Sequence, residues 1–502
     1  MDIDIGRFLA KRAWLDGGRP ALIADGRRLS FAELNAAANR AARALQAQGV
    51  RRGDRVAVLL RNGVDYVALY YAAAKLGAIL CGINWRLAAP EIGFILADSE
   101  PKLLVYDMDF AATVDALPRH EIPIFAAGAE TKGRPSFDTL LAAAAEDEPA
   151  VGAGADDALV LVYTSGTTGR PKGAVLTHRQ MFWVSTTMAA THDYKQGDVN
   201  LVPTPLFHVG GLSFATLFVH MGATLALPRV WEPRAILRLI ADEKVNHFFA
   251  VSAMLRSLLE HPDLPKANLA SLRWILCGGA PVPPALIAAF AERDVPVLQT
   301  YGATETAGPA TAVDRDHALA KAGSAGLPYF HTDLRIVGKN GAAVPAGEIG
   351  EIQVRAPHLF AGYWRNPEAT AAAFDGDWLK TGDLGRRDAD GYLYIVDRAK
   401  DVVISGGENI YPAEIEAVLA AHPGIAEVAV VGLPDAEWGE VPCAVVVAKP
   451  GAAITLESLR AFCADKLARF KLPRRLQLSA APLPRNATGK LLKAEIRKAA
   501  TT

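Results

Sequence analysis

A repeated alternation of short apolar strands with amphipathic helices, over the first 330 residues, constrains the fold of this chain most strongly. The segment SFAELNAAANRAARALQAQG predicts a helix, because Ser30 and Glu33 form a capping box and Gly49 ends the apolar periodicity. The run DRVAVLL (54–60) predicts a buried strand, and DYVALYYAAAKLG (65–77) predicts the next helix. The same alternation continues in ATLALP, RAILRLIADEKV, HFFAV and LRWILCGG. It predicts an α/β protein with layered, largely parallel sheets.

The sequence pattern changes at about residue 333. Segments 333–356 and 391–404 are rich in β-branched residues and in the turn dipeptides NG and DG, so we expect hairpins there. Beyond residue 400, AEIEAVLAAHP, AEVAVVGLPD, PCAVVVAK and LESLRAFCADKLA predict a separate α+β domain of roughly a hundred residues. We therefore expect a large N-terminal domain at 1–398, with layered α/β subdomains and a β-rich subdomain, and a small mobile α+β domain at 399–502.

Composition narrows the classes of function. The 502 residues carry a formal net charge of −1, which gives no electrostatic footprint for nucleic acid. The four cysteines are scattered without a CxxC pair, so we expect no zinc site and no disulfide framework. No signal peptide is recognised in MDIDIGRFLAKRAW, and Lys75 interrupts the best candidate for a transmembrane segment. We therefore expect a cytoplasmic protein; the sequence does not indicate an oligomeric state.

A glycine-rich loop, YTSGTTGRPKGAVLTH (163–178), carries donors that suit an anion. Its spacing differs from that of the GxxxxGK[ST] phosphate loop. Its glycines still allow successive backbone N–H groups to point into one concavity, and its hydroxyls and lysine add further donors. This pattern indicates a polyphosphate site, with a flexible surface turn as the alternative.

Further motifs place this loop in a family context. They occur in order as PLFHVGG (205–211), CGGAPV (277–282), YGATET (301–306), WLKTGD (378–383), DRAKDVVISGGENIYPAEIE (397–416) and PRNATGK (484–490). Together with the loop they resemble the motifs of the adenylate-forming superfamily, in its acyl-CoA synthetase and fatty-acid–CoA ligase branch. The resemblance covers nearly the entire chain.

The resemblance implies an ATP-dependent, AMP-forming carboxylate–CoA ligase. A carboxylate would attack the α-phosphorus of ATP to give an acyl-adenylate and pyrophosphate, and the thiolate of coenzyme A would then displace AMP. ATP, Mg²⁺ and coenzyme A are the implied cofactor set, and a small carboxylic acid is the implied partner. The protein would mainly position like charges and neutralise them.

The resemblance also assigns the nucleotide site residue by residue. Glu305 is implied as the Mg²⁺ ligand, since this hard cation takes oxygen ligands, and Thr304 as a donor to the α-phosphate. Tyr301 is implied to stack on adenine, Asp383 to accept from the ribose diol, and Arg398 to reach the ribose or phosphate. The full implied ATP site is Thr164, Ser165, Gly166, Thr167, Thr168, Gly169, Lys172, Gly279, Ala280, Pro281, Tyr301, Thr304, Asp383, Arg398 and Lys490.

The C-terminal motifs are implied to supply the moving parts. Lys490 resembles the lysine that contacts both the carboxylate and the α-phosphate during adenylation; by spacing alone it would be a solvated charge in a basic tail. Lys400 matches the hinge about which the small domain rotates, and Gly406 and Gly407 match the entry path of pantetheine. The implied catalytic set is Lys490, Thr304, Glu305 and His208.

The implied acyl pocket is apolar and built from small residues. His208 would gate it or orient the carboxylate, although an isolated histidine there is more often a core residue. The other implied wall residues are Gly278, Gly302, Ala303 and Ala307. The segment after His208 has no acidic residue to pair with an α-ammonium and no cation for a second carboxylate. We therefore expect a medium- or long-chain fatty acid.

Several alternatives stay open from the sequence. An aryl acid of the hydroxycinnamate or benzoate type fits the small wall residues as well as a fatty chain does. An acyl acceptor other than coenzyme A is a further alternative. A luciferase-like oxygenase and a nucleotide-binding regulator without activity are the rival classes; the presence of Lys172, Glu305, Asp383, Arg398 and Lys490 argues against the regulator.

Overall fold

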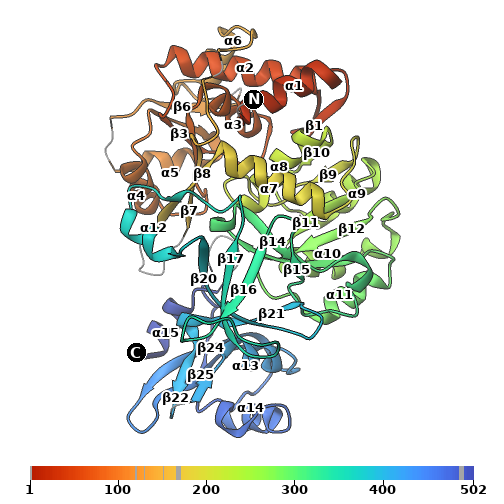
Figure 1. Ribbon diagram of the computed structural model, residues 1–502, viewed down its shortest axis with the longest axis vertical. Coiled ribbons are helices and arrows are strands. Elements are labelled where there is room, and N and C mark those ends of the chain that lie inside the picture. The colour runs from red at the N-terminus through yellow and green to blue at the C-terminus, as the bar shows by residue number, and fades with distance from the viewer. Residues whose placement is uncertain are drawn as a thin grey trace. The chain divides into compact units, whose positions relative to one another are not determined.

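The protein divides into two compact units in a computed structural model. The structure describes residues 3–118, 121–128, 131–150, 152–164, 171–406, 408–485 and 491–501. Unit 1 is Met1–Leu334 with Val354–Leu379, and unit 2 is Arg335–Gln353 with Lys380–Thr502 (Figure 1). The chain passes between the units within strands β16 (Asp333–Val337), β17 (Gly350–Arg355) and β20 (Trp378–Arg387). The boundary expected after residue 398 concerns a functional rotation and stays a prediction.

Unit 1 contains a nine-stranded sheet with a parallel centre and antiparallel edges. The parallel run is β13-β12-β11-β9-β10-β1, and β14 and β2 pair antiparallel at its two ends. In sheet order the strands are β15 (Leu327–Pro328), β14 (Gly308–Ala312), β13 (Val297–Ala303), β12 (Trp274–Cys277), β11 (His247–Ala250), β9 (Val199–Leu201), β10 (Thr224–Leu227), β1 (Pro20–Ala24) and β2 (Arg27–Ser30).

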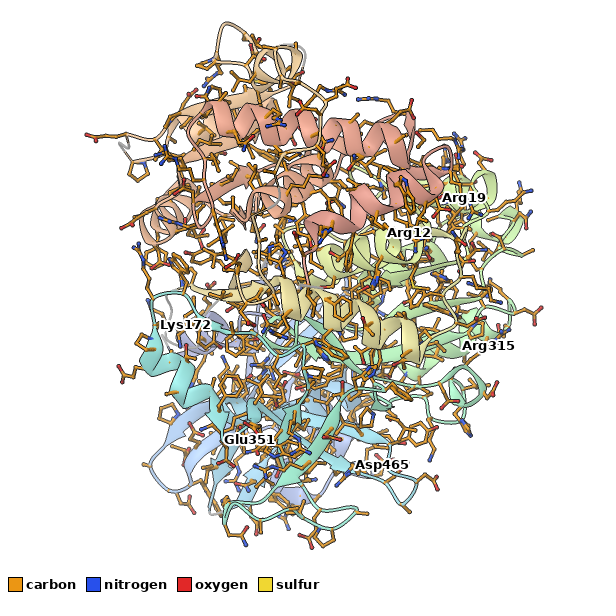
Figure 2. All side chains as sticks on the ribbon, turned by 45° about the horizontal axis from the view of Figure 1, so that its top comes forward. Arg12, Arg19, Lys172, Arg315, Glu351 and Asp465 are labelled. Carbon is orange, nitrogen blue, oxygen red and sulfur yellow. The ribbon has the colours of Figure 1, made fainter. Side chains whose placement is uncertain are left out.

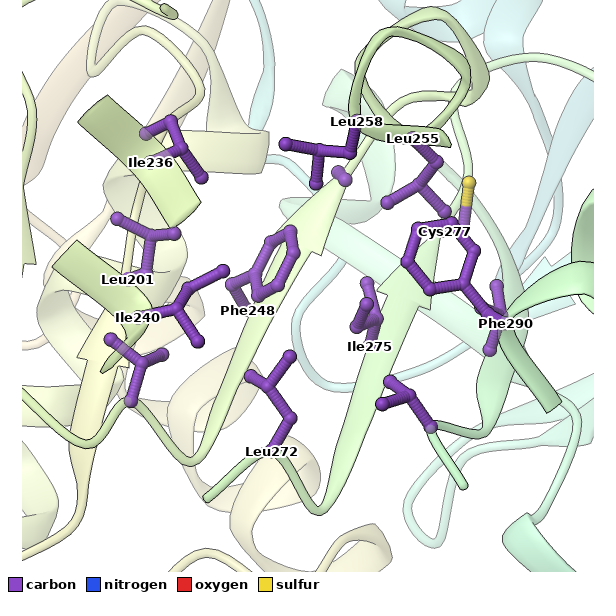
Figure 3. Close-up of a cluster of buried hydrophobic side chains, with 14 of the residues drawn as sticks. Leu201, Ile236, Ile240, Phe248, Leu255, Leu258, Leu272, Ile275, Cys277 and Phe290 are labelled. Carbon is purple, nitrogen blue, oxygen red and sulfur yellow. The ribbon is translucent and has the colours of Figure 1, made fainter. Parts of the chain in front are cut away.

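A continuous apolar core covers one face of this sheet. Helices α9 (Pro233–Asp242), α10 (Ser252–Leu259) and α11 (Pro284–Ala291) pack side chains against β9, β11 and β12 (Figure 3). The labelled core residues are Leu201, Ile236, Ile240, Phe248, Leu255, Leu258, Leu272, Ile275, Cys277 and Phe290, each with an exposed fraction of 6% or less. Cys277 ends β12 within this core, so a close-packed layer fixes the start of the CGGAPV motif.

The second sheet of unit 1 has seven strands in the order β18-β8-β7-β4-β3-β5-β6. In this order, the strands from β7 to β6 pair parallel with their neighbours. Strand β8 pairs antiparallel with β7, and β18 pairs antiparallel with β8. Their bounds are β18 (Gly362–Tyr363), β8 (Lys172–Thr177), β7 (Ala158–Thr164), β4 (Ile79–Gly82), β3 (Arg55–Leu59), β5 (Leu103–Asp107) and β6 (Ile124–Ala127). The predicted strand DRVAVLL is thus the buried centre of a parallel sheet, and the predicted α/β architecture is confirmed.

The remaining helices of unit 1 follow the sequence signals. Helix α2 begins directly after Ser30, which forms a capping box with Glu33 of the first turn, and α3 ends at Gly77, which has the left-handed conformation, as the sequence predicts. Figure 1 shows α7 and α8 side by side, and they pack on each other. The bounds are α1 (Gly6–Asp16), α2 (Phe31–Ala47), α3 (Val64–Leu76), α4 (Ala89–Ser99), α5 (Ala111–Asp115), α6 (Phe137–Ala142), α7 (His178–Thr191), α8 (Val209–Met221) and α12 (Pro367–Ala373).

Helix α3, which holds the most apolar stretch, lies in the interior of unit 1. Lys75 is 0% exposed there, and its ammonium pairs with Glu148 and with Asn35, the latter at 2.9 Å. Burial lowers the pKa of this lysine. Within the described part of the chain, no helix has the length and apolarity needed to cross a membrane.

Unit 2 builds its own layer of strands and helices. Strands β24 (Ile425–Asp435) and β25 (Gly439–Ala448) form a long antiparallel hairpin, and β22 (Val403–Ser405) and β26 (Arg475–Leu478) both pair with β25. Strand β23 (Glu408–Ile410) pairs antiparallel with β22. Its helices are α13 (Pro412–Leu419), α14 (Leu456–Cys463) and α15 (Lys493–Thr501). The predicted small α+β domain is confirmed as an architecture.

The predicted hairpins are confirmed in part. Strands β16 and β17 are neighbours in one sheet, as the NG turn predicts. The second segment, 391–404, does not form a hairpin by itself. Its first strand, β21 (Leu393–Arg398), pairs with β20 around the DG turn, whereas β22 joins the sheet of β25. The one-turn 3₁₀ helix Ala399–Asp401 separates the two strands and directs them into different sheets.

Candidate active site

Two neighbouring parallel strands of the nine-stranded sheet end where the predicted adenine-binding motifs begin. Strand β12 leads into residues 278–281, and β13 contains Tyr301; Cys277 lies opposite Gln299 in their register. Carboxyl ends of parallel strands meet at one edge of a sheet, so the structure brings the two motifs together. Residues 279–281 are exposed and Tyr301 is half-buried, so this edge is accessible to a ligand.

Gly278 and Gly302 are required by close approach of the backbone. A Cβ on Gly278 would lie 2.4 Å from the carbonyl oxygen of Thr300, and one on Gly302 would lie 2.1 Å from that of Gly308. Both distances are far below van der Waals contact, so neither position accepts a side chain without movement of the main chain. This requirement explains both glycines independently of the acyl pocket, and their place in that pocket stays a prediction.

The two alanines of the predicted acyl pocket differ in environment. Ala303 is half-buried and precedes the one-turn 3₁₀ helix Thr304–Thr306, whereas Ala307 is 0% exposed. Ala307 has a φ of 53°, and its carbonyl oxygen accepts a hydrogen bond from Ser213 Oγ of α8 at 2.6 Å. Helix α8 is thereby fixed to the YGATET motif.

A tyrosine joins the predicted metal ligand to the predicted phosphate-binding lysine. Tyr363 donates its hydroxyl hydrogen to Glu305 Oε1 at 2.8 Å, and Lys172 Nζ lies 5.2 Å from the centre of the Tyr363 ring. The Phe360 N–H donates to the Glu305 carbonyl oxygen at 2.8 Å, which fixes the backbone of that residue. The negatively charged Glu305 and the positively charged Lys172 therefore both lie against the side chain of Tyr363. Thr304 directly precedes Glu305 in the chain.

The hairpin of β7 and β8 carries the glycine-rich loop. Thr164 ends β7 opposite Lys172, which begins β8 (Figure 2), and Thr164 Oγ1 lies 3.5 Å from the Lys172 carbonyl oxygen. The structure thus brings the two flanking residues of the predicted phosphate loop together. The predicted loop residues Ser165, Gly166, Thr167, Thr168 and Gly169 lie outside the described residues.

His208 directly precedes α8 and packs its ring on Phe207, with 4.5 Å between the ring centres. Its Nε2 is buried and has no hydrogen-bond partner within the described ranges. Burial, and secondly the Arg86 charge, lower the pKa of His208 to about 4. The imidazole is therefore neutral at neutral pH, and it can donate one hydrogen bond to a carboxylate without adding a charge.

In unit 2, the two predicted ribose ligands form an ion pair. Asp383 of β20 lies opposite Arg398 of β21 in the register, with Arg398 Nε 2.6 Å from Asp383 Oδ1. Asp383 is 6% exposed, and its N–H donates to Thr381 Oγ1 at 3.1 Å. Both side chains are thus held by paired strands, and the ion pair orients the Asp383 carboxylate, whose oxygens can accept hydrogen bonds from a diol.

The predicted hinge and pantetheine residues follow directly along the chain. Lys400 is exposed in the one-turn 3₁₀ helix that separates β21 from β22. Gly406 has a φ of 57°, and a Cβ there would lie 2.6 Å from the ring of Trp438, so only glycine fits that turn. Gly407 and Lys490 lie outside the described residues, so their assigned roles stay predictions.

The interpretation of the sequence missed Tyr363. Its contact with Glu305 depends on β18, which pairs with β8 so that Tyr363 lies opposite Ala174. The two strands are far apart in the sequence, and neither GYW nor its neighbours carries a local signal of a metal site. The short β18 has only two residues, too few for a periodic pattern to reveal it.

Comparison with known proteins gives the same family that the sequence motifs indicate. A model of the AMP-binding enzyme family matches residues 9–364, and a model of the AMP-binding enzyme C-terminal domain matches residues 414–490. The long-chain-fatty-acid–CoA ligase FadD13 of Mycobacterium tuberculosis is 42% identical over 99% of this chain and 98% of its own length. A feruloyl-CoA synthase from an Amycolatopsis species is 40% identical over 98% of each chain.

A solved structure supports the same conclusion. The o-succinylbenzoate CoA synthetase of Bacillus subtilis, in complex with its acyl-adenylate intermediate, superimposes with a TM-score of 0.89 at 36% identity, over 98% of this chain and 97% of that chain. The motifs, the fold and the full-length similarity agree. The chain belongs to the AMP-binding enzyme family, in its branch of AMP-forming acyl-CoA and aryl-CoA ligases.

Proposed function

We propose that this CoA ligase activates an apolar carboxylic acid, with a medium- or long-chain fatty acid as its substrate class. The observation that carries this proposal is helix α8, which begins after His208. Its sequence VGGLSFATLFVHM contains no Asp, Glu, Lys or Arg, and most of its residues are buried. Phe214 of this helix stacks on Phe249 of β11 with 5.4 Å between the ring centres. As a wall of the acyl pocket, this uncharged helix would favour an acyl chain over a dicarboxylate.

An aryl acid is the second candidate. The same aromatic side chains suit an aromatic substrate. The feruloyl-CoA synthase that is 40% identical to this chain is named for such an acid. FadD13, at 42% identity, is named for long-chain fatty acids. We prefer the fatty acid because small residues line the predicted pocket, which leaves room for a long chain.

In the proposed first half-reaction, a carboxylate oxygen of the substrate attacks the α-phosphorus of ATP, and pyrophosphate leaves. Lys490 would contact both anions and offset their repulsion, and Lys172 and the glycine-rich loop would hold the β- and γ-phosphates. Neutral His208 would donate a hydrogen bond to the substrate carboxylate. Asp383 and Arg398 would hold the ribose, and Tyr301 would stack on adenine.

Glu305 would supply the protein ligand for Mg²⁺. Tyr363 donates to its Oε1, which leaves Oε2 for the cation. One carboxylate combined with phosphate oxygens and water is a usual coordination for Mg²⁺ in nucleotide enzymes. The cation would neutralise charge on the phosphates.

In the proposed second half-reaction, the thiolate of coenzyme A attacks the carbonyl carbon of the acyl-adenylate, and AMP leaves. Rotation about Lys400 would exchange the residues presented by the small domain between the two steps. Gly406 and Gly407 would line the path of the pantetheine arm.

The test is a panel of carboxylates with ATP and Mg²⁺: acetate, malonate, octanoate, palmitate, benzoate and ferulate. Pyrophosphate release is followed with and without coenzyme A, and the thioester is identified by mass. Turnover on octanoate or palmitate that depends on coenzyme A supports the proposal. Turnover on ferulate or benzoate alone assigns the aryl class, and turnover on malonate overturns the proposed apolar pocket. Pyrophosphate release without any thioester would point to another acyl acceptor.

A further inference from the structure

A cavity of about 310 Å³ lies at the edge of the nine-stranded sheet where the parallel strands β12 and β13 begin. Trp274, which begins β12, and Leu298, the second residue of β13, are among its lining residues. The predicted adenine-binding residues follow the other ends of the same strands, about 10 Å away at the rise of an extended strand. We name this cavity the amino-edge pocket; its lining includes Arg273, Trp274, Leu298, Val313, Arg315 and Leu327.

The amino-edge pocket is distinct from the sites described above. All of its lining residues belong to unit 1, and none of them belongs to the predicted nucleotide, acyl or coenzyme A sites. Figure 2 shows Arg315, which lines the pocket, far from Lys172 of the predicted phosphate site. A ligand of this pocket would therefore bind without occupying the place of ATP or of the acyl group.

Buried side chains give the pocket an apolar, preformed wall. Leu298 and Val313 are 2% and 1% exposed, and Trp274 is 4% exposed. The Trp274 ring stacks on His247 with 4.3 Å between the ring centres and 7° between the planes, and it contacts Tyr194 edge-on at 5.1 Å. The orientation of this ring is therefore fixed before any ligand arrives. A wall of this kind accommodates a flat apolar group.

Two arginines supply the positive charge in the lining. Arg273 is committed to the protein, since its guanidinium pairs with Asp198 and its Nη1 lies 3.7 Å from Asp193 Oδ2. Its buried Nε still has no hydrogen-bond partner among the described residues. Arg315, which is exposed at the start of a one-turn 3₁₀ helix, makes no ion pair in the described part of the chain. Both arginines therefore have N–H donors that no described group uses.

The acidic residues of the lining already have partners. Lys195 Nζ lies 3.0 Å from Asp193, and Asp314 accepts from the N–H of His317 and lies 2.7 Å from its Nδ1. Burial lowers the pKa of His192 to about 4, so this lining residue is neutral at neutral pH. Unused donors and occupied acceptors favour a ligand that accepts hydrogen bonds, which is an anion rather than a cation.

We propose that the amino-edge pocket is a second binding site of this enzyme, for a small aromatic carboxylate. The carboxylate of the ligand pairs with Arg315, and its ring lies against Trp274 and Leu298. A volume of about 310 Å³ is at the lower end of the range for ligand sites, which suits a single ring rather than a long chain. This second site does not depend on which acid the active site activates.

The test is a titration of the full-length enzyme with 4-fluorobenzoate, followed by fluorine NMR, with no ATP present so that no acid is activated. Arg315→Ala should weaken binding by about five- to tenfold, which is the cost of one partly exposed charge-assisted hydrogen bond. Leu327, which lines the pocket and is 36% exposed, supplies a matched pair of variants. Leu327→Glu should weaken binding by about tenfold because it repels the anion, and Leu327→Lys should leave binding equal or tighter.

Two controls separate this pocket from other sites. Arg238→Ala removes an exposed arginine of α9 that does not line the pocket, and it should change binding by less than about twofold. Saturating AMP should not displace the probe, because the predicted nucleotide motifs lie at the other edge of the sheet. The melting temperature of each variant is measured as a check of folding, and the Leu327 variants carry the test if Arg315→Ala does not fold.

Four results would overturn the proposal. Unchanged binding in both Arg315→Ala and Leu327→Glu would place the probe elsewhere in the molecule. Equal losses in Leu327→Glu and Leu327→Lys would exclude recognition of an anion at this position. Displacement of the probe by AMP would place it in the nucleotide site. Absence of saturable binding at millimolar probe would mean that the pocket holds only water.

Discussion

Unit 1 and unit 2 place their active-site residues by different means. In unit 1, Tyr301 lies near the end of β13, and Glu305 and residues 279–281 follow the ends of strands whose bodies are buried in an apolar core. In unit 2, Asp383 and Arg398 hold each other, Lys493 of α15 pairs with Glu416 of α13, and Asp397 accepts from the N–H of Ala413. Packing fixes the first group, and electrostatics fixes the second.

This difference matters because the two kinds of contact respond to different conditions. Close-packed apolar cores resist small changes and fail when volume or backbone space is lost. Ion pairs and buried carboxyls depend on protonation and on the geometry of each partner. A unit that changes partners during catalysis can exchange polar contacts at lower cost than it can open a hydrophobic core.

The largest expected effect is that of Lys490→Ala in the C-terminal domain. We expect adenylation to fall by about 10²–10³, the usual cost of losing a preorganised donor to the transition state. Thioester formation from supplied acyl-adenylate should be spared, because the two approaching anions are then absent. Rapid-quench measurement of both half-reactions on one preparation checks this. Equal loss in both steps would contradict the assigned role.

The next largest expected effect is a difference between the two units in how their stability changes as pH falls. Partial or full burial lowers the pKa of six histidines in unit 1 to about 4: His178, His192, His208, His220, His247 and His358. The unfolded chain therefore binds protons between pH 6.5 and 4 that folded unit 1 does not, so stability falls with pH in that window, by about 1–3 kcal/mol per group. Asp4 and Asp65, with pKa values raised to about 6, oppose part of this loss.

Unit 2 should lose less stability than unit 1 as pH falls. Its sequence contains one histidine, His422, and burial raises the pKa of Asp397 and Glu416, so these carboxyls take up protons in the folded unit as pH falls. Hydrogen bonds lower the pKa of Asp435 and Asp465, which offsets part of that gain. Hydrogen exchange measured by mass spectrometry at pH 7 and pH 5, corrected for the intrinsic rates, checks both units at once. We expect faster opening of β11–β13 and unchanged or slower opening of β24–β25. Opening of β24–β25 before β11–β13 would contradict the comparison.

The sequence predicts most of the fold because periodicity and caps are local signals. The capping box at Ser30, the parallel strands and the β24–β25 hairpin all follow from short segments. The motifs also place Thr164, Lys172, Tyr301 and Asp383 in order along the chain. Resemblance rather than spacing assigns their roles, and the structure brings Thr164 and Lys172 together.

What the sequence could not predict depends on contacts between distant segments. Tyr363 contacts Glu305 because of the two-residue strand β18. Lys493 pairs with Glu416, which is far from it in the sequence. The place of Gly278 and Gly302 in the acyl pocket stays a prediction, and the structure adds that close backbone neighbours require glycine at both positions. Steric need and ligand binding select the same residue there, so a single sequence cannot separate them.

The hinge offers a smaller effect confined to one half-reaction. Lys400→Pro fixes φ at its own position and restricts Ala399, so the turn between β21 and β22 loses freedom. We expect thioester formation to fall by about tenfold and adenylation to fall less, because the proposed rotation would occur between the two steps. Lys400→Ala, which keeps the freedom of the backbone, serves as the matched control. A comparable loss in both half-reactions would count against a hinge at this residue.

The smallest expected effect tests whether a polar contact matters within the packed unit. Tyr363→Phe keeps the ring beneath Lys172 and removes the hydroxyl that donates to Glu305 Oε1. Glu305 then keeps its place at the end of β13 but loses one orienting bond, so we expect kcat/KM for Mg-ATP to fall by only about fivefold. Excess Mg²⁺ should recover most of that loss, because an oriented ligand raises affinity for the cation. Lys172→Met should not respond to Mg²⁺. A hundredfold loss in Tyr363→Phe would mean that polar contacts, and not the buried strands alone, position the residues of unit 1 as well.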